Sequence, residues 1–370
     1  MKVLLVEYRD GRNPRAGGAE RALQEVFGRL AGRGWKVDYL CSAFDGDGEE
    51  EIGGIRVLRR GPEPLFGLSA VRALHGELRN MAYDLVIEGI DKLPFFLPWL
   101  APRRRVACIV PHLLGETAVA AAGLLAGTAI NAAETAMPLC YRHCTLVTGA
   151  ESTRQELMRR GFAPSRIHVV PYGLDHTLFT SEPGPGSSQE PPFVLYVGRL
   201  RRYKSLDVAL RAFAGIASEV PGVRFKIAGE GDDRPRLERL VREWGIAERV
   251  DFVGFVSETE KVRLMRQARV LAYSSRKEGW GLPVIEANAC GTPAVASRVD
   301  GLRDAVRDGE SGVLVPYGDV AGFGEALRRL LTDAGWHARL RAGALVWASG
   351  FQWETSADAM ERALRGALED

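Results

Sequence analysis

The sequence predicts an α/β protein with two domains, each built on a parallel β-sheet. Its 370 residues are enough for two domains of ordinary size. In both halves, short apolar runs alternate with segments of helical spacing, which is the pattern of a parallel sheet covered by helices. Residues 181–192 are rich in Pro, Gly and Ser, as linkers often are. We therefore expect domains at 1–180 and 193–350, followed by a helical segment at 351–370.

Composition argues against several other classes of protein. Apolar residues make up 46% of the chain and charged residues 26%, which are ordinary globular values. A formal net charge of +2 gives no overall basis for a nucleic-acid partner. The five cysteines include no Cys-x-x-Cys pair, which argues against a disulfide framework and a zinc site. We expect a cytoplasmic protein without a signal peptide or a transmembrane segment.

The first half begins with a strand predicted at Lys2–Glu7 and a helix predicted at Ala19–Leu30. The loop between them ends in Gly17 and Gly18. It lacks the Gly-x-Gly-x-x-Gly spacing of a dinucleotide site, which weakens a dehydrogenase interpretation. The glycine pair is most simply a turn that lets backbone segments pass closely. A phosphate contact at the pair is the alternative.

More strands and helices follow in the first half, and one of them places a histidine at a position of interest. Strands are predicted at Val37–Ser42, Ile55–Leu58, Asp84–Glu88, Arg105–Val110 and Leu146–Thr148, with helices at Leu68–Arg79 and Ser152–Arg160. In open parallel sheets, ligands bind beyond the carboxyl ends of the strands. His112 lies just after such an end and is a candidate for ligand contact. A lone histidine is, however, more often a structural hydrogen-bonding group.

The second half opens with a strand predicted at Phe193–Val197 and a cationic loop that begins at Gly198. Arg199 and Lys204 in this loop can bind phosphate, Arg through its planar fork and Lys as a point charge. A solvated basic loop is the alternative interpretation. Gly229 lies in a later turn that opens a helix, and it is a weaker candidate for the same chemistry.

Two carboxylates, Glu278 and Glu286, stand with seven residues between them. Gly279 and Gly281 interrupt regular structure around Trp280, so the first carboxylate is expected in a loop. Carboxylates accept hydrogen bonds from sugar or ribose hydroxyls. The pair therefore indicates a polyhydroxylated ligand, with an ordinary loop and helix as the alternative.

A helix is predicted to start at Pro283, whose fixed φ suits a first turn, and to run to Cys290 with Gly291 as its stop. Glu286 is then expected on the first turn. The N–H groups near Gly281–Val284 should be unpaired there, and such groups favour phosphate oxygens.

The segment EGWGLPVIEANACGTPAVAS, which starts at Glu278, resembles the Glu-x7-Glu signature of the retaining glycosyltransferases of family 4. That family has the GT-B fold, two Rossmann-like domains facing a central cleft with the last helix crossing back to the first domain. The resemblance covers nearly the whole chain and is strongest from Gly198 to Pro316. Trp280 stands where Phe is usual and Asn288 where a smaller residue is usual, and neither change removes a functional group.

The resemblance implies transfer of a sugar from a UDP- or GDP-linked donor to an acceptor hydroxyl, without a metal or other cofactor. Arg199, Lys204 and the N–H groups near Gly281 would then hold the diphosphate. Glu286 would hold the ribose and Glu278 the donor sugar. The implied catalytic residues are His112, Glu278, Arg199 and Lys204. The implied donor site comprises Gly17, Gly18, Gly198, Arg199, Lys204, Gly229, Gly254, Phe255, Glu278, Gly279, Trp280, Gly281, Leu282 and Glu286, with Gly254 and Phe255 at the base.

Three alternatives remain at this stage. A sugar-nucleotide epimerase of related fold would need acid and base side chains in place of the Glu-x7-Glu arrangement. An NAD enzyme would need the glycine turn that the chain lacks. A catalytically silent member that binds a partner is opposed by the presence of Glu278, Glu286 and Arg199.

The acceptor is expected to be a carbohydrate or a lipid-linked molecule of cell-envelope glycolipid or polysaccharide synthesis. The apolar run LPFFLPWL, which ends at Leu100, lies close to the basic run Arg103–Arg105. This combination is typical of peripheral contact with an anionic membrane, here its inner face. Burial of the apolar run, with the arginines in a solvated turn, is the alternative.

Overall fold

The computed structural model describes residues 1–91, 93–119, 123–181 and 191–369. The chain forms two compact units, Met1–Gly173 with Gln352–Asp370, and Leu174–Phe351. The second unit therefore begins before the expected linker at 181–192, of which residues 182–190 lie outside the described residues. Leu174 joins the second unit because its N–H donates to the carbonyl oxygen of Phe351 at 3.1 Å.

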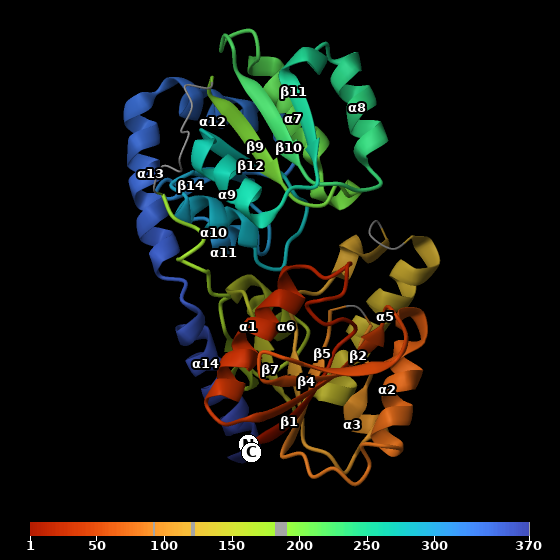
Figure 1. Cartoon of the computed structure of the whole chain (residues 1–370). Helices are drawn as coiled ribbons and strands as arrows, with labels where there is room; N and C mark the ends of the chain where they lie inside the picture. The colour runs from red at the N-terminus through yellow and green to blue at the C-terminus, as the bar shows by residue number, and fades with distance from the viewer. Residues whose placement is uncertain (92, 120–122, 182–190, 370) are drawn as a thin grey trace. The chain divides into compact units, whose positions relative to one another are not determined.

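The first unit contains an eight-stranded sheet within the described residues, in the order β3-β4-β2-β1-β5-β6-β7-β8 (Figure 1). All neighbouring strands pair in parallel except β3 and β4, so the predicted parallel sheet is confirmed apart from this edge. The strands are β1 Lys2–Val6, β2 Lys36–Ala43, β3 Gly48–Ile52, β4 Ile55–Pro62, β5 Leu85–Gly89, β6 Val106–Ile109, β7 Thr145–Thr148 and β8 Ile167–Val169.

Helices cover both faces of this sheet because successive side chains of a strand point to opposite faces. Val3 and Leu5 of β1 lie in a core with α1 and α14. Leu4 and Val6 lie in a second core with α2. The helices of this unit are α1 Gly18–Gly32, α2 Phe66–His75, α3 Leu97–Leu100, α5 Leu124–Tyr141, α6 Glu151–Arg159 and α14 Trp353–Glu369, with 3₁₀ turns at Glu63–Leu65, Gly115–Thr117 and Pro164–Arg166.

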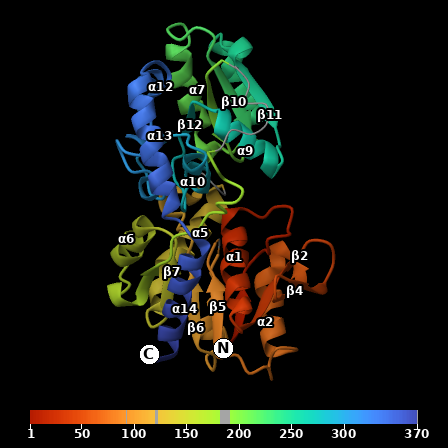
Figure 2. The same ribbon diagram turned by 60° about the vertical axis from the view of Figure 1, so that its left-hand side comes forward.

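The last helix, α14, belongs to the first unit and packs against α1 and β7 (Figure 2). The Arg33 guanidinium of the first unit pairs with Glu354 and Asp358 of α14, at 2.8 and 2.7 Å. The Ser356 hydroxyl donates to the carbonyl oxygen of Pro171 at 2.7 Å. The return of the chain end to the first domain, which the resemblance implied, is confirmed.

The second unit contains a six-stranded parallel sheet in its described residues, in the order β11-β10-β9-β12-β13-β14 (Figure 1). The strands are β9 Phe193–Val197, β10 Arg224–Ala228, β11 Val250–Gly254, β12 Val270–Tyr273, β13 Ala294–Ser297 and β14 Gly312–Val315. The helices are α7 Leu206–Ile216, α8 Arg234–Glu243, α9 Glu258–Gln267, α10 Leu282–Ala289, α11 Leu302–Ala305, α12 Val320–Thr332 and α13 Ala334–Ser349, with 3₁₀ turns at Arg202–Lys204 and Ala247–Arg249.

The strand order of the second unit reverses between β9 and β12. From β9 the chain proceeds outward through β10 and β11, and it then returns to the other side of β9 for β12, β13 and β14. Ligands of open α/β sheets bind outside the carboxyl ends of the strands at such a reversal. The segments that follow β9 and β12 are therefore the place to look for a site.

Candidate active site

The loops after β9 and β12 leave the same edge of the second sheet because these strands are parallel neighbours. They carry Lys204 and Glu278, whose charged groups meet. The Lys204 Nζ lies 2.6 and 2.8 Å from the two carboxylate oxygens of Glu278. The Ser275 hydroxyl also donates to Glu278 Oε1, at 2.6 Å. Two predicted site residues that are far apart in sequence thus form one ion pair at the strand-order reversal.

Lys204 is buried and is held by aromatic faces and by an unusual backbone turn. Its Nζ lies 5.1 Å from the centroid of the Tyr203 ring and 5.5 Å from that of Tyr273, distances typical of cation–π contact. The next residue, Ser205, has φ +48°, which is rare for a residue other than glycine. Its carbonyl oxygen accepts from Ser274 at 2.8 Å, and its hydroxyl lies 2.9 Å from that of Tyr317. Sequence patterns had not identified Ser205.

The arginines of the first loop differ in their partners. Arg201 pairs with Asp232 at 2.6 Å, and Arg202 lies 3.9 Å from Asp233. The exposed Arg199 guanidinium makes no hydrogen bond or ion pair with any described residue. Arg199 is therefore available for an external anion, whereas its two neighbours have partners on the protein.

Glycines near the site let backbone segments pack closely. Gly229 has φ +141°, and a Cβ there would lie 2.0 Å from the carbonyl oxygen of Gly198. The Gly198 N–H in turn donates to the carbonyl oxygen of Ala228 at 3.0 Å, and Gly229 donates to that of Gly254 at 2.7 Å. These contacts require small residues whether or not a phosphate binds there. Phe255 follows as an exposed side chain.

Helix α10 begins one residue before the predicted start and ends one residue before the predicted end. Gly281 precedes it in the left-handed conformation, and its carbonyl oxygen accepts from the Val284 N–H at 2.9 Å. The expectation of unpaired N–H groups through Val284 is therefore wrong, because the tight turn uses that donor. Among the described residues, the N–H groups of Gly281 and Leu282 have no acceptor. Glu286 is the fifth helical residue and not the fourth as expected, so it lies just past the first turn.

Trp280 is buried, and its ring packs edge-to-face against Phe351 with centroids 5.5 Å apart. The ring therefore fills the core, which leaves the backbone as the part of Trp280 that could contact a ligand. The loop is also anchored two residues earlier, at Glu278, whose N–H donates to the carbonyl oxygen of Asp300 at 3.2 Å. Gly301 lies against Glu278 and Gly279, where a Cβ would come within 2.3 Å of a carbonyl oxygen.

Glu286 faces a lysine that the sequence analysis did not single out. Lys261 Nζ lies 3.1 Å from Glu286 Oε1 and 2.9 Å from Glu258 Oε2. Ser257 caps this helix, α9, by accepting the Glu260 N–H at 3.2 Å, as its capping-box pattern suggests. The cap marks the start of the helix but carries no information about which face meets α10.

In the first unit, Gly17 and Gly18 lie at the start of α1. The Gly17 N–H donates to the carboxylate of Glu20 at 2.8 Å, so the helix caps itself. Burial, reinforced by the charge of Asp91, raises the pKa of Glu20. A carboxylate from the same turn therefore uses one of the donors that a phosphate contact would need, and the phosphate role of this pair stays a prediction.

His112 is half-buried in the segment that follows β6. The second and third residues after it are tied to α5, because the Leu114 and Gly115 N–H groups donate to the buried carboxylate of Glu134 at 2.6 and 2.8 Å. Arg160 reaches the same carboxylate at 3.3 Å. Glu134 thus holds the backbone that carries His112. Its isolated position in an Ala-rich helix gave no sequence signal for this role.

The two halves of the chain match two family models. The model "Glycosyltransferase Family 4" matches residues 16–178, and the model "Glycosyl transferases group 1" matches residues 180–345. A D-inositol 3-phosphate glycosyltransferase of Thermobifida fusca is 31% identical over 95% of this chain and 89% of that protein. The chain belongs to glycosyltransferase family 4. This membership favours a glycosyltransferase over the epimerase and NAD-enzyme alternatives.

Solved structures agree with this family 4 assignment at the level of the fold. Sucrose-phosphate synthase from Thermosynechococcus elongatus superimposes with a TM-score of 0.81 at 24% identity, covering 99% of this chain and 98% of that one. The Anabaena protein HepE, solved in complex with UDP-glucose, has a TM-score of 0.76 at 19% identity and covers 99% of this chain and 100% of its own. The predicted GT-B fold is confirmed.

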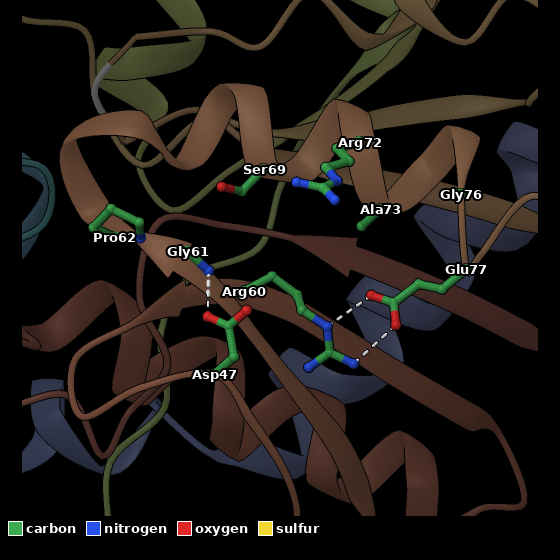
Figure 3. Close-up of a pocket in the computed structure, with 9 residues that line it drawn as sticks. All are labelled: Asp47, Arg60, Gly61, Pro62, Ser69, Arg72, Ala73, Gly76 and Glu77. Carbon is green, nitrogen blue, oxygen red and sulfur yellow. Dashed lines mark hydrogen bonds and ion pairs between the residues drawn. The ribbon is translucent and has the colours of Figure 1, made fainter.

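The first unit of this glycosyltransferase also contains a pocket of about 540 Å³ between β4 and α2, outside the predicted site. Figure 3 shows one ion pair and one bond from a main-chain N–H to a carboxylate along its wall. Arg60 contacts Glu77 at 2.7 Å, and Asp47 accepts from the Gly61 N–H at 2.7 Å. No group of three or more His, Cys, Asp or Glu side chains in the described ranges could hold a metal ion.

Proposed function

We propose that this glycosyltransferase transfers a sugar from a UDP- or GDP-linked donor to an acceptor hydroxyl, with retention of anomeric configuration and without a metal ion. The observation that carries the proposal is the arrangement at the strand-order reversal of the second sheet. There, Lys204 of the loop after β9 pairs with Glu278 of the loop after β12, and the loop after β9 also carries Arg199, whose guanidinium has no partner among the described residues. Support also comes from HepE, a protein of the same fold that was solved with UDP-glucose.

The main electrostatic demand of such a reaction is the negative charge that develops on the leaving diphosphate. Arg199 would accept this charge through its planar fork, and Lys204 would do so as a compact ammonium. An ammonium has three N–H donors, so Lys204 can contact a phosphate oxygen while it still holds Glu278. The N–H groups of Gly281 and Leu282 would add two neutral donors.

The hydroxyl groups of the donor need acceptors, which carboxylates supply. Glu286 would accept from the ribose and Glu278 from the transferred sugar. The pairing of Glu278 with Lys204 would link sugar binding to diphosphate binding, since one ion pair contacts both parts of the donor. His112 of the first unit would orient the sugar during transfer.

A screen of nucleoside diphosphate sugars by thermal shift tests the donor proposal. A ligand that binds the native state stabilises it by mass action and so raises the unfolding temperature. At a ligand concentration of about a hundred times Kd, the free energy of unfolding rises by about 2.7 kcal/mol. We expect UDP- or GDP-linked sugars to raise it and the free sugars to leave it unchanged. No shift with any sugar nucleotide would contradict the proposal. Donor binding without transfer to any acceptor would favour a catalytically silent member.

The product and the metal requirement give a second test. NMR of the product should show the anomeric configuration of the donor, and turnover should persist in excess chelator because Arg, Lys and main-chain N–H groups neutralise the diphosphate. An inverted linkage, or activity abolished by chelator and restored by a divalent cation, would contradict this part.

The acceptor is proposed to be a carbohydrate, polyol or lipid-linked hydroxyl at the inner face of a cytoplasmic membrane. Exposed apolar side chains of the first unit include Leu68 and Trp99, which are 72% and 57% exposed. Arg104 donates to the carbonyl oxygens of Leu78 and Met81 and so has a structural role, which leaves Arg103 as the better electrostatic candidate. No helix in the described residues is both long and apolar enough to cross a bilayer.

Cosedimentation with anionic vesicles tests the membrane contact. Binding is expected at low salt, with a loss at high salt and in Arg103→Ser, since each basic residue near such a surface contributes about 1 kcal/mol. Trp99→Ser should weaken binding at both salt concentrations. An absence of binding at low salt would favour a soluble acceptor.

A further inference from the structure

Lys261 is the fourth residue of α9 and is buried at 9% exposure. Its Nζ lies between two carboxylates, 3.1 Å from Glu286 Oε1 and 2.9 Å from Glu258 Oε2. The same Nζ lies 4.9 Å from the centroid of the Phe179 ring. The partners differ in exposure, because the Glu258 side chain is 47% exposed and that of Glu286 is 14% exposed. The contact with Glu286 is therefore the one that lies away from solvent.

A buried lysine at this position requires an explanation because an ammonium is costly to remove from water unless it has a partner. An apolar residue would pack between α9 and α10 without that cost. Without Lys261, the carboxylates of Glu258 and Glu286 would lie on the same side of the site with no cation between them. The lysine therefore influences how the Glu286 carboxylate is held and oriented.

Hydrogen bonds tie together the segments on both sides of this contact. The Thr292 hydroxyl, just after α10, donates to the carbonyl oxygens of Met265 and Ala268 at the end of α9, at 2.5 and 3.2 Å. Arg266 of α9 donates to the carbonyl oxygen of Thr180 at 2.7 Å. These bonds fix α9 against α10 and against the start of the second unit. The distance from Lys261 to Glu286 therefore also depends on hydrogen bonds made by neighbouring residues.

We propose that Lys261 is a positioning residue for Glu286 and thereby sets the preference of the enzyme for a ribose over a 2′-deoxyribose donor. The inference rests on the proposed function, in which Glu286 contacts the ribose. An ionised carboxylate offers about four acceptor positions on its two oxygens, and Lys261 contacts Oε1. It orients the plane of the carboxylate, so that the carboxylate oxygens meet the ribose diol in a fixed geometry for charge-assisted hydrogen bonds.

The experiment compares Kd values for UDP and 2′-deoxy-UDP, and for GDP and 2′-deoxy-GDP, by calorimetry. Wild type should bind the ribonucleotide about tenfold more tightly than its deoxy analogue, which is the size of one hydrogen bond to a charged group. Lys261→Met should lower this ratio to about twofold, mainly by weakening the ribonucleotide. Lys261→Arg, which keeps the charge, should retain most of it.

Two further variants separate positioning from a general structural effect. In a Glu286→Gln background, Lys261→Met should cause almost no additional loss, because the two residues act through one contact. Arg263→Met removes a charge from the same helix, where Arg263 pairs with Glu260 at 2.6 Å, and should leave the ratio unchanged. With the full donor, Lys261→Met should raise KM by about fivefold with little change in kcat.

Each outcome bears on one claim. A wild-type ratio retained in Lys261→Met would overturn the positioning role while leaving the proposed function intact. Equal weakening of ribose and deoxyribose nucleotides would also overturn it, since that result indicates only a structural role. If wild type bound neither UDP nor GDP, the proposed function itself would fail, and the inference with it.

Discussion

In the first unit, the buried carboxylates of Glu88 and Glu134 accept hydrogen bonds from main-chain N–H groups, whereas in the second unit Glu278 and Glu286 face lysines. Glu88 accepts from Phe95 and Leu97 at 2.5 and 3.1 Å. In the second unit, Glu278 and Glu286 lie 2.6 and 3.1 Å from the ammonium nitrogens of their lysine partners. Arg160 is a further partner of Glu134, at 3.3 Å, but the carboxylates of the first unit mainly organise backbone, whereas those of the second unit pair with ammonium groups.

The difference follows from burial and from what each partner can release. A main-chain N–H that loses a buried acceptor has no water to replace it, so these carboxylates are structural. A lysine has three donors and a flexible stem, so it can share them with a ligand. The side chains of Glu278 and Glu286 are 11% and 14% exposed, which lets a ligand reach them. Stability should therefore depend most on the first pair and activity on the second.

The largest expected effect comes from the cations of the second unit. Arg199→Ala or Lys204→Ala should lower kcat/KM by about 10²-fold or more, since one lost charge contact in the transition state costs roughly 2 to 4 kcal/mol. Arg201→Ala is the matched control, because its guanidinium pairs with Asp232 on the surface. Steady-state kinetics with the preferred donor measures all three. Near-normal turnover in both the Arg199 and the Lys204 variant would contradict the claim that activity depends on the charged groups of the second unit.

Glu134→Ala should chiefly lower stability. Two main-chain N–H groups would lose their acceptor, at a cost of about 2 kcal/mol or more in the free energy of unfolding. Urea unfolding measures this loss. Nucleotide binding by the second unit should stay within about twofold of wild type, because Glu134 does not belong to that unit. Unchanged stability would show that the contact does not hold the His112 segment.

Within the second unit, the two carboxylates should be separable. Glu286→Ala should weaken binding of the free nucleoside diphosphate by about tenfold, which corresponds to about 1.4 kcal/mol. Glu278→Ala should leave that binding nearly intact and impair use of the complete donor. Calorimetry with the diphosphate, followed by kinetics with the sugar nucleotide, distinguishes the two. An equal loss of diphosphate binding in both variants would contradict this division of roles.

The smallest effect concerns Glu88, where burial raises the pKa of the carboxyl to about 7. Between its unfolded and folded pKa values the folded protein holds a proton that the unfolded chain has released, so stability falls as pH rises through 7. The expected loss is about 1 kcal/mol between pH 6 and pH 8. Glu88→Gln should be less stable overall but should show a flatter dependence. Urea unfolding of both proteins at both pH values measures this difference. An equal loss of stability with pH in wild type and in Glu88→Gln would contradict the prediction.

Local patterns predicted most of the regular structure correctly. The ends of α10 differ by one residue from prediction because Pro283 and Gly291 act through their own backbone preferences. By contrast, β3 was missed, since its run of Glu lacks the apolar alternation of a half-buried strand. The signal that could have revealed it is Gly53-Gly54, whose positive φ values form a two-residue hairpin turn.

The sequence by itself determined the family, the fold class and the charged residues at the strand-order reversal, because motif spacing, apolar periodicity and turn residues are properties of short segments. The tertiary structure alone decided which charges meet. Lys204 and Glu278 are 74 positions apart, and Lys261 and Glu286 are 25 apart. Their contacts arise from the order of parallel strands and the packing of α9 on α10. Neither arrangement is encoded in the residues next to a lysine or a glutamate along the chain.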